Sequence, residues 1–431
     1  MIVTIEKSSI RGIVDAPPSK SVAQRLILAT LLSKPGTITL RRIPKCGDVL
    51  SSLNFVKSTN VEYYEDNGVY IFKIPEELEL KKNIIDLGDS GTTYRIAIGL
   101  ASTFREAVVL ECGRSMRRRP ISDLVEALKK LGAQIQYIEE PGYPPVRVRG
   151  PLKGGKVSIR GDISSQYISS LIYAGIRSED GIEINVKPPI VSKPYMLLTV
   201  KLLKNLGADV DIEGDEEEGY TIFSYPSDID TFNLEVPGDY ALSAFIMSIA
   251  AVCGEEVVIR GFNDYLNSVD IEILQYFKDM NINVKKIGDL VYVSYSDNIE
   301  PCDLDLHDNP DLVMPIVAVA SFSNGKSIIR NVKHLIHKES NRLREISRTL
   351  REFNIKTNID EERGYIEIVP GRDYKAANID LPDDHRIAMM CSVIACRVDG
   401  VTVLRNAECV NKSWPEYWNI LRKLGVRLEI H

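Results

Sequence analysis

Residues 128–135 read LKKLGAQI, and this stretch recurs with small changes along the chain. Gly and Asn tolerate the left-handed backbone that ends many helices, so a Gly or Asn after such a run predicts a helix followed by a strand. The starting residues 56, 128, 203, 277, 350 and 421 lie 72, 75, 74, 73 and 71 positions apart, which predicts six structural repeats. The six stretches are VKSTNVEY 56–63, LKKLGAQI 128–135, LKNLGADV 203–210, FKDMNINV 277–284, LREFNIKT 350–357 and LRKLGVRL 421–428.

Each repeat combines two helical patterns with strands. In the second repeat, apolar residues at helical spacing over 92–102 precede a strand pattern at 106–111, a helix pattern at 122–131 and a strand pattern at 134–138. Repeats of this size cannot bury their apolar faces alone, so we expect them to associate. Pro and Gly mark two linkers, at 15–19 and 236–239. These patterns predict an α/β (α+β) protein with two domains of three repeats each.

Composition excludes several classes of protein. The 431 residues are 44% hydrophobic and 26% charged, which is typical of a globular protein and not of a fibrous or disordered one. The longest apolar run, 242–253, is shorter than the roughly 20 residues of a membrane helix, and the N-terminus has no signal-peptide pattern. We therefore expect a cytoplasmic protein with no membrane partner.

The spacing of the Cys and His residues and the net charge limit the kinds of ligand and partner that we expect. The seven Cys contain no Cys-x-x-Cys pair and the five His no His-Glu-x-x-His arrangement, so we expect neither a disulfide framework nor a metal site. The net charge of −7 argues against a nucleic-acid partner. Basic clusters at 114–119 and 338–344 are nevertheless sufficient for a small anion.

Two stretches in the first half have the features of anion sites. The sequence PSKSVAQR, 18–25, predicts the start of a helix, with Lys20 just before its first turn. Ser21 and Arg25 are four residues apart and therefore share one helix face. The sequence LGDSGTTYR, 87–95, enters a helix through Gly91, where a phosphate could approach the bare backbone. Taken singly, each stretch fits a capped surface helix equally well.

Other stretches supply hydroxyl, amide and carboxylate groups. GDISSQY, 161–167, and SKPY, 192–195, can contact phosphate oxygens or substrate hydroxyls, although such residues commonly cap helices. In the second half, carboxylates stand among cations at Asp311, in KESNR, 338–342, and in DDHR, 383–386. A salt-bridged surface helix is the alternative interpretation of 338–342.

In order and spacing, these motifs together resemble the 5-enolpyruvylshikimate-3-phosphate synthase family over essentially all 431 residues. The resemblance implies the enolpyruvyl transferase fold, a two-domain inverted αβ barrel of six βαβαββ units. Residues 1–17 and 239–431 would form one lobe and 18–238 the other, with the active site in the cleft between them. The residues that carry the resemblance are Ser19, Lys20, Ser21, Arg25, Gly91, Thr92, Arg95, Arg119, Pro120, Ser164, Ser165, Gln166, Ser192, Lys193, Pro194, Tyr195, Asp311, Lys338, Glu339, Arg342, Asp384, His385, Arg386 and Lys412.

The resemblance also implies a reaction. Such an enzyme transfers the enolpyruvyl group of phosphoenolpyruvate to the 5-hydroxyl of 3-phosphoshikimate and releases phosphate, a step of the shikimate pathway of aromatic amino acid (chorismate) biosynthesis. The two substrates carry about five or six negative charges, which only a site rich in Lys and Arg can hold. No cofactor is implied, and we expect a monomer.

Residue roles follow from the same resemblance. Asp311 would take the proton of the attacking hydroxyl, and Glu339, helped by Lys20, would protonate the methylene carbon of phosphoenolpyruvate. The residues implied for 3-phosphoshikimate are Lys20, Ser21, Arg25, Ser164, Ser165, Gln166, Ser192, Asp311 and Lys338. Those implied for phosphoenolpyruvate are Lys20, Gly91, Arg119, Gln166, Arg342, Arg386 and Lys412.

The sequence departs from the family pattern at a few positions, and two rivals remain open. His334 stands where bacterial members commonly have Asn, so the shikimate contact of that Asn does not carry over to it. Ile96 and Asp89-Ser90 replace the usual residues around Gly91, so inhibitor sensitivity at this loop does not carry over either. One rival is UDP-N-acetylglucosamine enolpyruvyl transferase, but Arg114 occupies the place of its reactive Cys and Cys112 lies two residues away. The other is a non-catalytic or RNA-end-processing relative of the same architecture, against which the presence of both Asp311 and Glu339 argues.

Overall fold

The computed structural model describes residues 1–371 and 373–431. The chain divides into two compact units: unit 1 comprises Met1–Ser19 and Pro237–His431, and unit 2 comprises Lys20–Val236. The first division lies at the end of the stretch 15–19 and the second inside 236–239, where Pro and Gly interrupt regular structure. Each unit is described by itself.

Unit 2 contains twelve described strands: β3 (Gly36–Arg41), β4 (Glu62–Asp66), β5 (Val69–Ile74), β6 (Ile84–Asp86), β7 (Val108–Glu111), β8 (Gln134–Tyr137), β9 (Val146–Arg149), β10 (Gly155–Arg160), β11 (Ile182–Lys187), β12 (Val210–Asp215), β13 (Gly219–Ser224) and β14 (Asn233–Glu235). They form three sheets with the orders β14-β3-β5-β4, β6-β7-β9-β8 and β10-β11-β13-β12. In every sheet the first pair is parallel and the other two pairs are antiparallel.

Unit 1 repeats this plan with β1 (Ile2–Glu6), β2 (Gly12–Asp15), β15 (Glu256–Arg260), β16 (Val284–Ile287), β17 (Leu290–Ser294), β18 (Asp303–Asp305), β19 (Ser327–Arg330), β20 (Lys356–Asp360), β21 (Tyr365–Val369), β22 (Asn378–Asp380), β23 (Val401–Arg405) and β24 (Leu428–Ile430). The sheet orders are β16-β17-β15-β2, β18-β19-β21-β20 and β22-β23-β1-β24. β1 lies antiparallel to β23 and β24, so the first strand of the chain completes the last sheet. β2 lies parallel to β15, although all of unit 2 lies between these two strands in the sequence.

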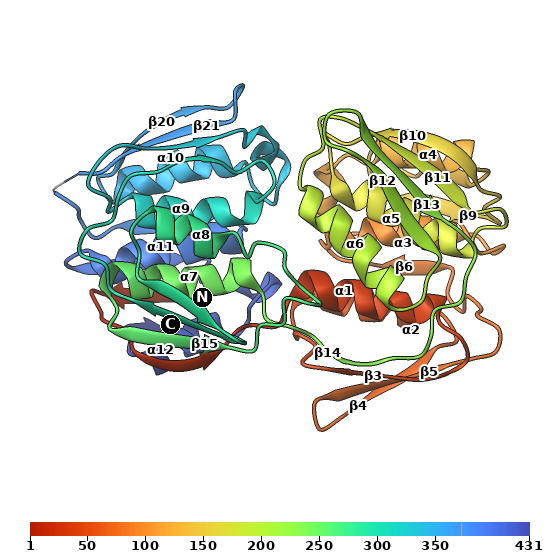
Figure 1. Ribbon diagram of the computed structural model, residues 1–431, viewed down its shortest axis with the longest axis horizontal. Helices are drawn as coiled ribbons and strands as arrows, with labels where there is room; N and C mark the ends of the chain where they lie inside the picture. The colour runs from red at the N-terminus through yellow and green to blue at the C-terminus, as the bar shows by residue number, and fades with distance from the viewer. Residues whose placement is uncertain (372) are drawn as a thin grey trace. The chain divides into compact units, whose positions relative to one another are not determined.

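The helices alternate between buried and amphipathic ones. The buried helices are α1 (Lys20–Ala29), α3 (Gly91–Ala101) and α5 (Ser165–Arg177) in unit 2, and α7 (Tyr240–Cys253), α9 (Val313–Ala320) and α11 (His385–Arg397) in unit 1. Figure 1 shows α7, α9 and α11 packed side by side within unit 1. The half-exposed helices are α2 (Gly47–Lys57), α4 (Ser122–Lys130), α6 (Lys193–Asn205), α8 (Ile273–Asp279), α10 (Arg342–Glu352) and α12 (Tyr417–Leu424).

Short 3-10 turns lie between these elements. They are η1 (Thr30–Leu32), η2 (Met116–Arg118), η3 (Pro310–Leu312), η4 (Lys333–His337) and η5 (Ala407–Lys412). No helix in the described ranges combines the length and hydrophobicity needed to span a membrane.

The left-handed helix ends predicted from the repeat are present at five of six positions. Gly132, Gly207, Asn281, Asn354 and Gly425 have positive φ values of 107°, 94°, 58°, 63° and 111°. The prediction is wrong for Asn60, because α2 already ends at Lys57 and the side-chain amide of Asn60 hydrogen-bonds to the backbone of the segment 77–79 instead. Its side chain donates to the Glu77 carbonyl (2.9 Å) and accepts from the Glu79 N–H (2.9 Å).

The N-termini of the buried helices carry the chemistry-bearing residues, and their caps differ between the units. In unit 2, the Ser90 hydroxyl caps α3 and the Ser164 hydroxyl caps α5. In unit 1, the Asp239 carboxylate caps α7 and the Asp384 carboxylate caps α11. A helix N-terminus is an electropositive end, which a hydroxyl cap leaves uncompensated and a carboxylate cap neutralises.

Candidate active site

Lys20 and Ser21 open α1, with Lys20 as its first residue and not before it as expected. The Lys20 ammonium lies 3.0 Å from the Asp48 carboxylate at the start of α2, and the two side chains are only 13% and 10% exposed. The Ser21 carbonyl accepts a 2.9 Å hydrogen bond from Arg25 one turn later. The start of α1 therefore carries one cation paired with a carboxylate, Lys20, and a second cation, Arg25, further along the helix.

Arg25 is 1% exposed, and its guanidinium is held entirely by neutral groups among the described residues. Nε donates to the Thr199 hydroxyl (2.7 Å) and Nη2 to the Tyr195 carbonyl (3.1 Å), both on α6. Burial lowers the pKa of Arg25 from its usual value, while the nearby Tyr173 and Tyr195 act to raise it. A buried guanidinium without a carboxylate partner is a strong binding group for an incoming anion.

Gly91 and Arg119 lie against each other, although they are 28 positions apart in the chain. A Cβ added at Gly91 would stand 2.5 Å from Arg119 Nη1 and 2.8 Å from Cζ. Arg119 Nε is buried without a hydrogen-bond partner among the described residues. The two residues thus combine an open helix N-terminus with an uncompensated cation, which is the pattern of a phosphate site.

Arg95 and Gln166 connect α3 with α5 in the same unit. The Arg95 guanidinium donates to Gln166 Oε1 and, at 3.2 Å, to the Pro120 carbonyl. Gln166 Nε2 donates to the Thr92 hydroxyl at 3.0 Å. Gln166 is therefore held in one orientation next to Gly91.

Three serines predicted to contact substrate lie at the starts of α5 and α6. Ser164 accepts from the Gln166 N–H (3.3 Å), and Ser165 is buried directly after it. Ser192 precedes α6 with the left-handed values φ 55° and ψ 39°, unusual for a residue other than glycine. Strain of this kind is frequent at binding sites, where the surrounding structure holds a residue in one position.

In unit 1, one buried guanidinium gathers three carboxylates. Arg342, which is 1% exposed, lies 2.9 Å from Asp384, 2.9 Å from Glu339 and 3.3 Å from Asp311. Burial acts to lower the pKa of Arg342, but the charges of Asp384, Glu339 and Asp311 outweigh it and raise the pKa above its usual value. The two carboxylates expected to move protons are thereby held on opposite ends of one rigid fork.

Further cations complete this cluster. Arg386, at the start of α11, binds the Asp311 carboxylate at 2.8 Å and the Asp311 carbonyl at 3.0 Å. The Lys412 ammonium, at the end of η5, lies 3.6 Å from Glu339. Lys338, directly after η4, lies next to Glu339 in the chain and is half-buried. Arg342, Arg386 and Lys412 are thus engaged with carboxylates, whereas Arg25 and Arg119 have no carboxylate partner among the described residues.

His334 lies in η4, near Asp311 and Lys338. Burial lowers the pKa of His334 to about 3, and the positive charge of Lys338 and the neighbouring His307 contribute. Its Nε2 is buried without a hydrogen-bond partner among the described residues, and its ring meets that of His307 edge-on at 6.4 Å. A neutral imidazole with an unused nitrogen can donate to or accept from a substrate hydroxyl.

Comparison with known proteins decides between the alternatives. The family model for EPSP synthase (3-phosphoshikimate 1-carboxyvinyltransferase) matches residues 5–421. The chain belongs to the EPSP synthase family. A 3-phosphoshikimate 1-carboxyvinyltransferase of Caldivirga maquilingensis is 37% identical over 433 residues and one of Sulfurisphaera tokodaii 36% identical over 431 residues, in each case with all of both chains covered.

Solved structures agree with this assignment. An EPSP synthase from Acinetobacter baumannii matches with a TM-score of 0.84 and 23% identity, covering 99% of each chain. The enolpyruvyl transferase NikO from Streptomyces tendae matches with a TM-score of 0.76 and 14% identity, covering 99% of this chain and 98% of that one. At such identities these likenesses show the fold alone, and they confirm the enolpyruvyl transferase fold class. Membership in the EPSP synthase family makes the chain a transferase of the shikimate pathway and favours this function over both rivals.

Four residues that shape the family site were not assigned a role from the sequence. Asp48 pairs with Lys20, and Gln24 donates to the Asp48 carbonyl. Thr199 accepts from Arg25, and Asp384 pairs with Arg342. Asp384 and Gln24 lie inside quoted motifs, whereas Asp48 and Thr199 have no local signal. Each contacts its partner from a different helix, so only the folded structure reveals them.

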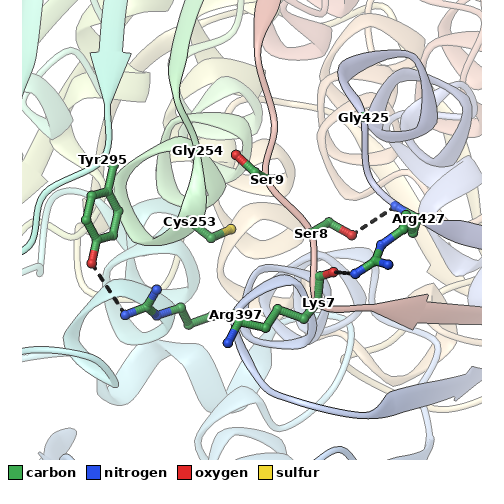
Figure 2. A pocket seen from close by; sticks show the side chains of 9 residues that line it. All are labelled: Lys7, Ser8, Ser9, Cys253, Gly254, Tyr295, Arg397, Gly425 and Arg427. Carbon is green, nitrogen blue, oxygen red and sulfur yellow. Dashed lines mark hydrogen bonds between the residues drawn. The ribbon is translucent and has the colours of Figure 1, made fainter.

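A hollow in unit 1 contains none of the predicted site residues. Figure 2 shows Lys7, Arg397 and Arg427 beside Cys253 and Gly425 in this hollow. Helices α7, α11 and α12 end at this hollow, and the unpaired carbonyl groups of a helix C-terminus attract nearby cations. Lys7 also pairs with Asp399 at 2.9 Å. The basic residues of the hollow thus balance helix ends.

Proposed function

We propose that this chain transfers the enolpyruvyl group of phosphoenolpyruvate to the 5-hydroxyl of 3-phosphoshikimate through the residues described above, releasing phosphate. The observation that carries the assignment of roles is the pair Asp311 and Glu339, held 3.3 and 2.9 Å from the single guanidinium of Arg342. Proton removal and proton delivery need two carboxylates in fixed positions, and this arrangement supplies them.

The proposed chemistry has two stages. The Asp311 carboxylate takes the proton of the 5-hydroxyl of 3-phosphoshikimate while the hydroxyl oxygen bonds to C2 of phosphoenolpyruvate. At the same time Glu339, assisted by Lys20, gives a proton to the methylene carbon of phosphoenolpyruvate. The Glu339 carboxylate then takes a proton back from the new methyl group as the C–O bond to phosphate breaks, and the proton held by Asp311 leaves with the phosphate. This sequence regenerates the enolpyruvyl double bond and both carboxyl groups.

The anions of the substrates would be bound mainly by unit 2. Arg25 and Arg119 lack carboxylate partners among the described residues, and Gly91 and the hydroxyl-capped helices offer free N–H groups. Arg25, Ser164, Ser165 and Ser192 would hold 3-phosphoshikimate, and Gly91 and Arg119 would hold phosphoenolpyruvate. Arg342, Arg386, Lys412 and Lys338 would exchange part of their contacts with carboxylates for contacts with substrate.

The proposed reaction uses residues of both units, so both sets would act on one pair of substrates. We also propose that the protein works as a cytoplasmic monomer and needs no cofactor. No group of three or more His, Cys, Asp or Glu side chains in the described part of the chain is arranged to hold a metal ion.

The test is phosphate release with 3-phosphoshikimate and phosphoenolpyruvate. Asp311→Asn and Glu339→Gln should each lose about 10²- to 10⁴-fold in kcat, the usual contribution of a general acid or base, and still bind 3-phosphoshikimate in calorimetry. Asp303→Asn, which removes an exposed partner of Arg330 in the same unit, is the control and should keep full activity. Release with UDP-N-acetylglucosamine instead of 3-phosphoshikimate would contradict the substrate, and full activity of either variant would contradict its role.

A further inference from the structure

Asp48 is a carboxylate outside the set expected from the sequence, yet it is the partner of Lys20. It lies in the first turn of α2, 28 positions after Lys20, and its Oδ2 is 3.0 Å from the Lys20 ammonium. Both side chains are nearly buried, with exposed fractions of 10% and 13%. A lysine ammonium on a flexible four-carbon stem has no preferred direction of its own, so a buried carboxylate at this distance determines where it lies.

Asp48 is in turn fixed by a buried amide. Gln24, one turn after Lys20 in α1 and 1% exposed, donates through Nε2 to the Asp48 carbonyl at 3.2 Å. The same nitrogen lies 2.7 Å from the Ser90 hydroxyl and 2.8 Å from the Thr93 hydroxyl at the start of α3. Asp48 is thereby tied to the helix that carries Lys20 and to the helix that begins at Gly91.

Buried hydroxyl groups reinforce this connection. The Thr93 hydroxyl lies 3.3 Å from the Asp48 carbonyl and 2.7 Å from the Ser52 hydroxyl of α2. Ser90, which Gln24 contacts, also caps α3 by accepting from the Thr93 N–H. A network in which every member has a partner is rigid, and it places Lys20 and Gly91 in a fixed relation.

We propose that Asp48 is a positioning residue for the reaction: its carboxylate holds the Lys20 ammonium in its charged form and aims it toward the anion site beside Gly91. This inference rests on the proposed function, in which Lys20 assists the proton delivered by Glu339, and on the family resemblance, which implies that Lys20 contacts phosphoenolpyruvate. A carboxylate beside an ammonium favours the protonated amine, and a lysine must be protonated to bind an anion or to help donate a proton.

The inference has a test that does not depend on turnover. Acetic anhydride reacts only with neutral amines, so trace labelling at several pH values followed by mass spectrometry reports how readily each lysine loses its proton. In Asp48→Asn, Lys20 should be labelled about tenfold faster at pH 8 than in the wild-type protein, the effect of losing a close opposite charge. Asp230→Asn is the matched control, because it removes the partner of the exposed Lys34 and should leave Lys20 unchanged.

Kinetics provide the second arm. Asp48→Asn should lower kcat at least tenfold, and Asp48→Glu should recover part of the loss because it restores the carboxylate. If Asp48→Asn does not fold, Asp48→Ser takes its place, since it also removes the charge and keeps the carbonyl that Gln24 contacts. A purely structural role would lower the melting temperature but leave the labelling rate of Lys20 and kcat of the folded variant unchanged.

The outcomes separate this inference from the proposed function. Lys20 labelling within twofold of wild type in both neutral variants overturns the role of Asp48, whatever the activity. A wild-type protein that releases no phosphate from the proposed substrates overturns the function, whereas the labelling result would still show whether Asp48 controls Lys20.

Discussion

Replacing Gly91 by Ala is the sharpest perturbation of the proposed phosphate site. The new Cβ would stand 2.5 Å from Nη1, 2.8 Å from Cζ and 3.0 Å from Nη2 of Arg119. Non-bonded carbon and nitrogen atoms rest about 3.5 Å apart, so the guanidinium must retreat by about 1 Å. Gly91 does not have the positive φ that favours glycine, so the backbone accepts alanine without strain.

The cost should appear in binding and hardly in stability. Arg119 is the far end of a flexible side chain, and its Nε has no partner among the described residues, so moving the group breaks no contact that holds the fold. A phosphate at Gly91 would lose one charge-assisted hydrogen bond, worth about 1.5–3 kcal/mol. Because 1.4 kcal/mol is tenfold in an equilibrium constant, the KM for phosphoenolpyruvate should rise by roughly 10- to 150-fold.

The assay is steady-state phosphate release, together with calorimetry for 3-phosphoshikimate and a melting curve. Gly91→Ala should leave the affinity for 3-phosphoshikimate and the melting temperature nearly unchanged. Gly99→Ala in the same helix is the contrasting variant, because its Cβ would stand 2.4 Å from the Ser170 backbone oxygen, which cannot move away cheaply, and it should lose stability. An unchanged KM for phosphoenolpyruvate in Gly91→Ala would refute the assignment of Gly91 and Arg119 to that substrate.

Two further predictions concern Arg25 and His334. Arg25→Lys should weaken 3-phosphoshikimate binding at least about tenfold in calorimetry. A lysine ammonium cannot bond the Thr199 hydroxyl, the Tyr195 carbonyl and an anion at the same time, as a guanidinium can. Equal affinity would contradict the role of Arg25. Burial lowers the pKa of His334 to about 3, below the roughly 6.5 of an unfolded His, so the unfolded state gains a proton first and stability should fall as the pH drops from about 6.5 toward 3. The loss should reach about 2 kcal/mol at pH 5 in urea unfolding, and His334→Asn should remove that part; an unchanged pH dependence would contradict it.

The repeat could be predicted from the sequence because its signal is local. A Gly or Asn that ends a helix acts on the backbone next to it, so five of the six predicted helix ends have the expected left-handed geometry. Asn60 is the exception because its amide contacts Glu77 and Glu79, a segment that the six-fold pattern does not contain. A local rule fails where a longer connection competes for the same side chain.

The partners of the site residues could not be predicted in this way. Asp48 lies 28 positions from Lys20, Thr199 lies 174 from Arg25, and Asp384 lies 42 from Arg342. The sequence therefore predicts candidate cations for the site, through motifs at helix starts, but it does not predict which of them pair with a carboxylate. That distinction decides how each cation acts, because a paired guanidinium positions carboxylates and an unpaired one binds anions.

The difference between the two units follows from substitutions at equivalent places in one scaffold. Every sheet has the same order of parallel and antiparallel pairs, and a buried helix begins at the same place in every repeat. In unit 2, hydroxyl groups of Ser90 and Ser164 cap such helices, and Arg25 is left without a carboxylate partner among the described residues. In unit 1, carboxylates of Asp239 and Asp384 take the same positions.

The caps therefore give these four helix starts different electrostatic character. A hydroxyl-capped helix start keeps its positive end for an anion, so the unit 2 set is prepared for phosphate and carboxylate groups. A carboxylate cap cancels that end, and Asp384 additionally binds Arg342, which leaves the guanidinium to hold Glu339 and Asp311 at 2.9 and 3.3 Å. In the proposed function, one topology would thus supply anion-binding groups in one unit and a pair of proton-transfer groups in the other, and a reaction between two anionic substrates requires both.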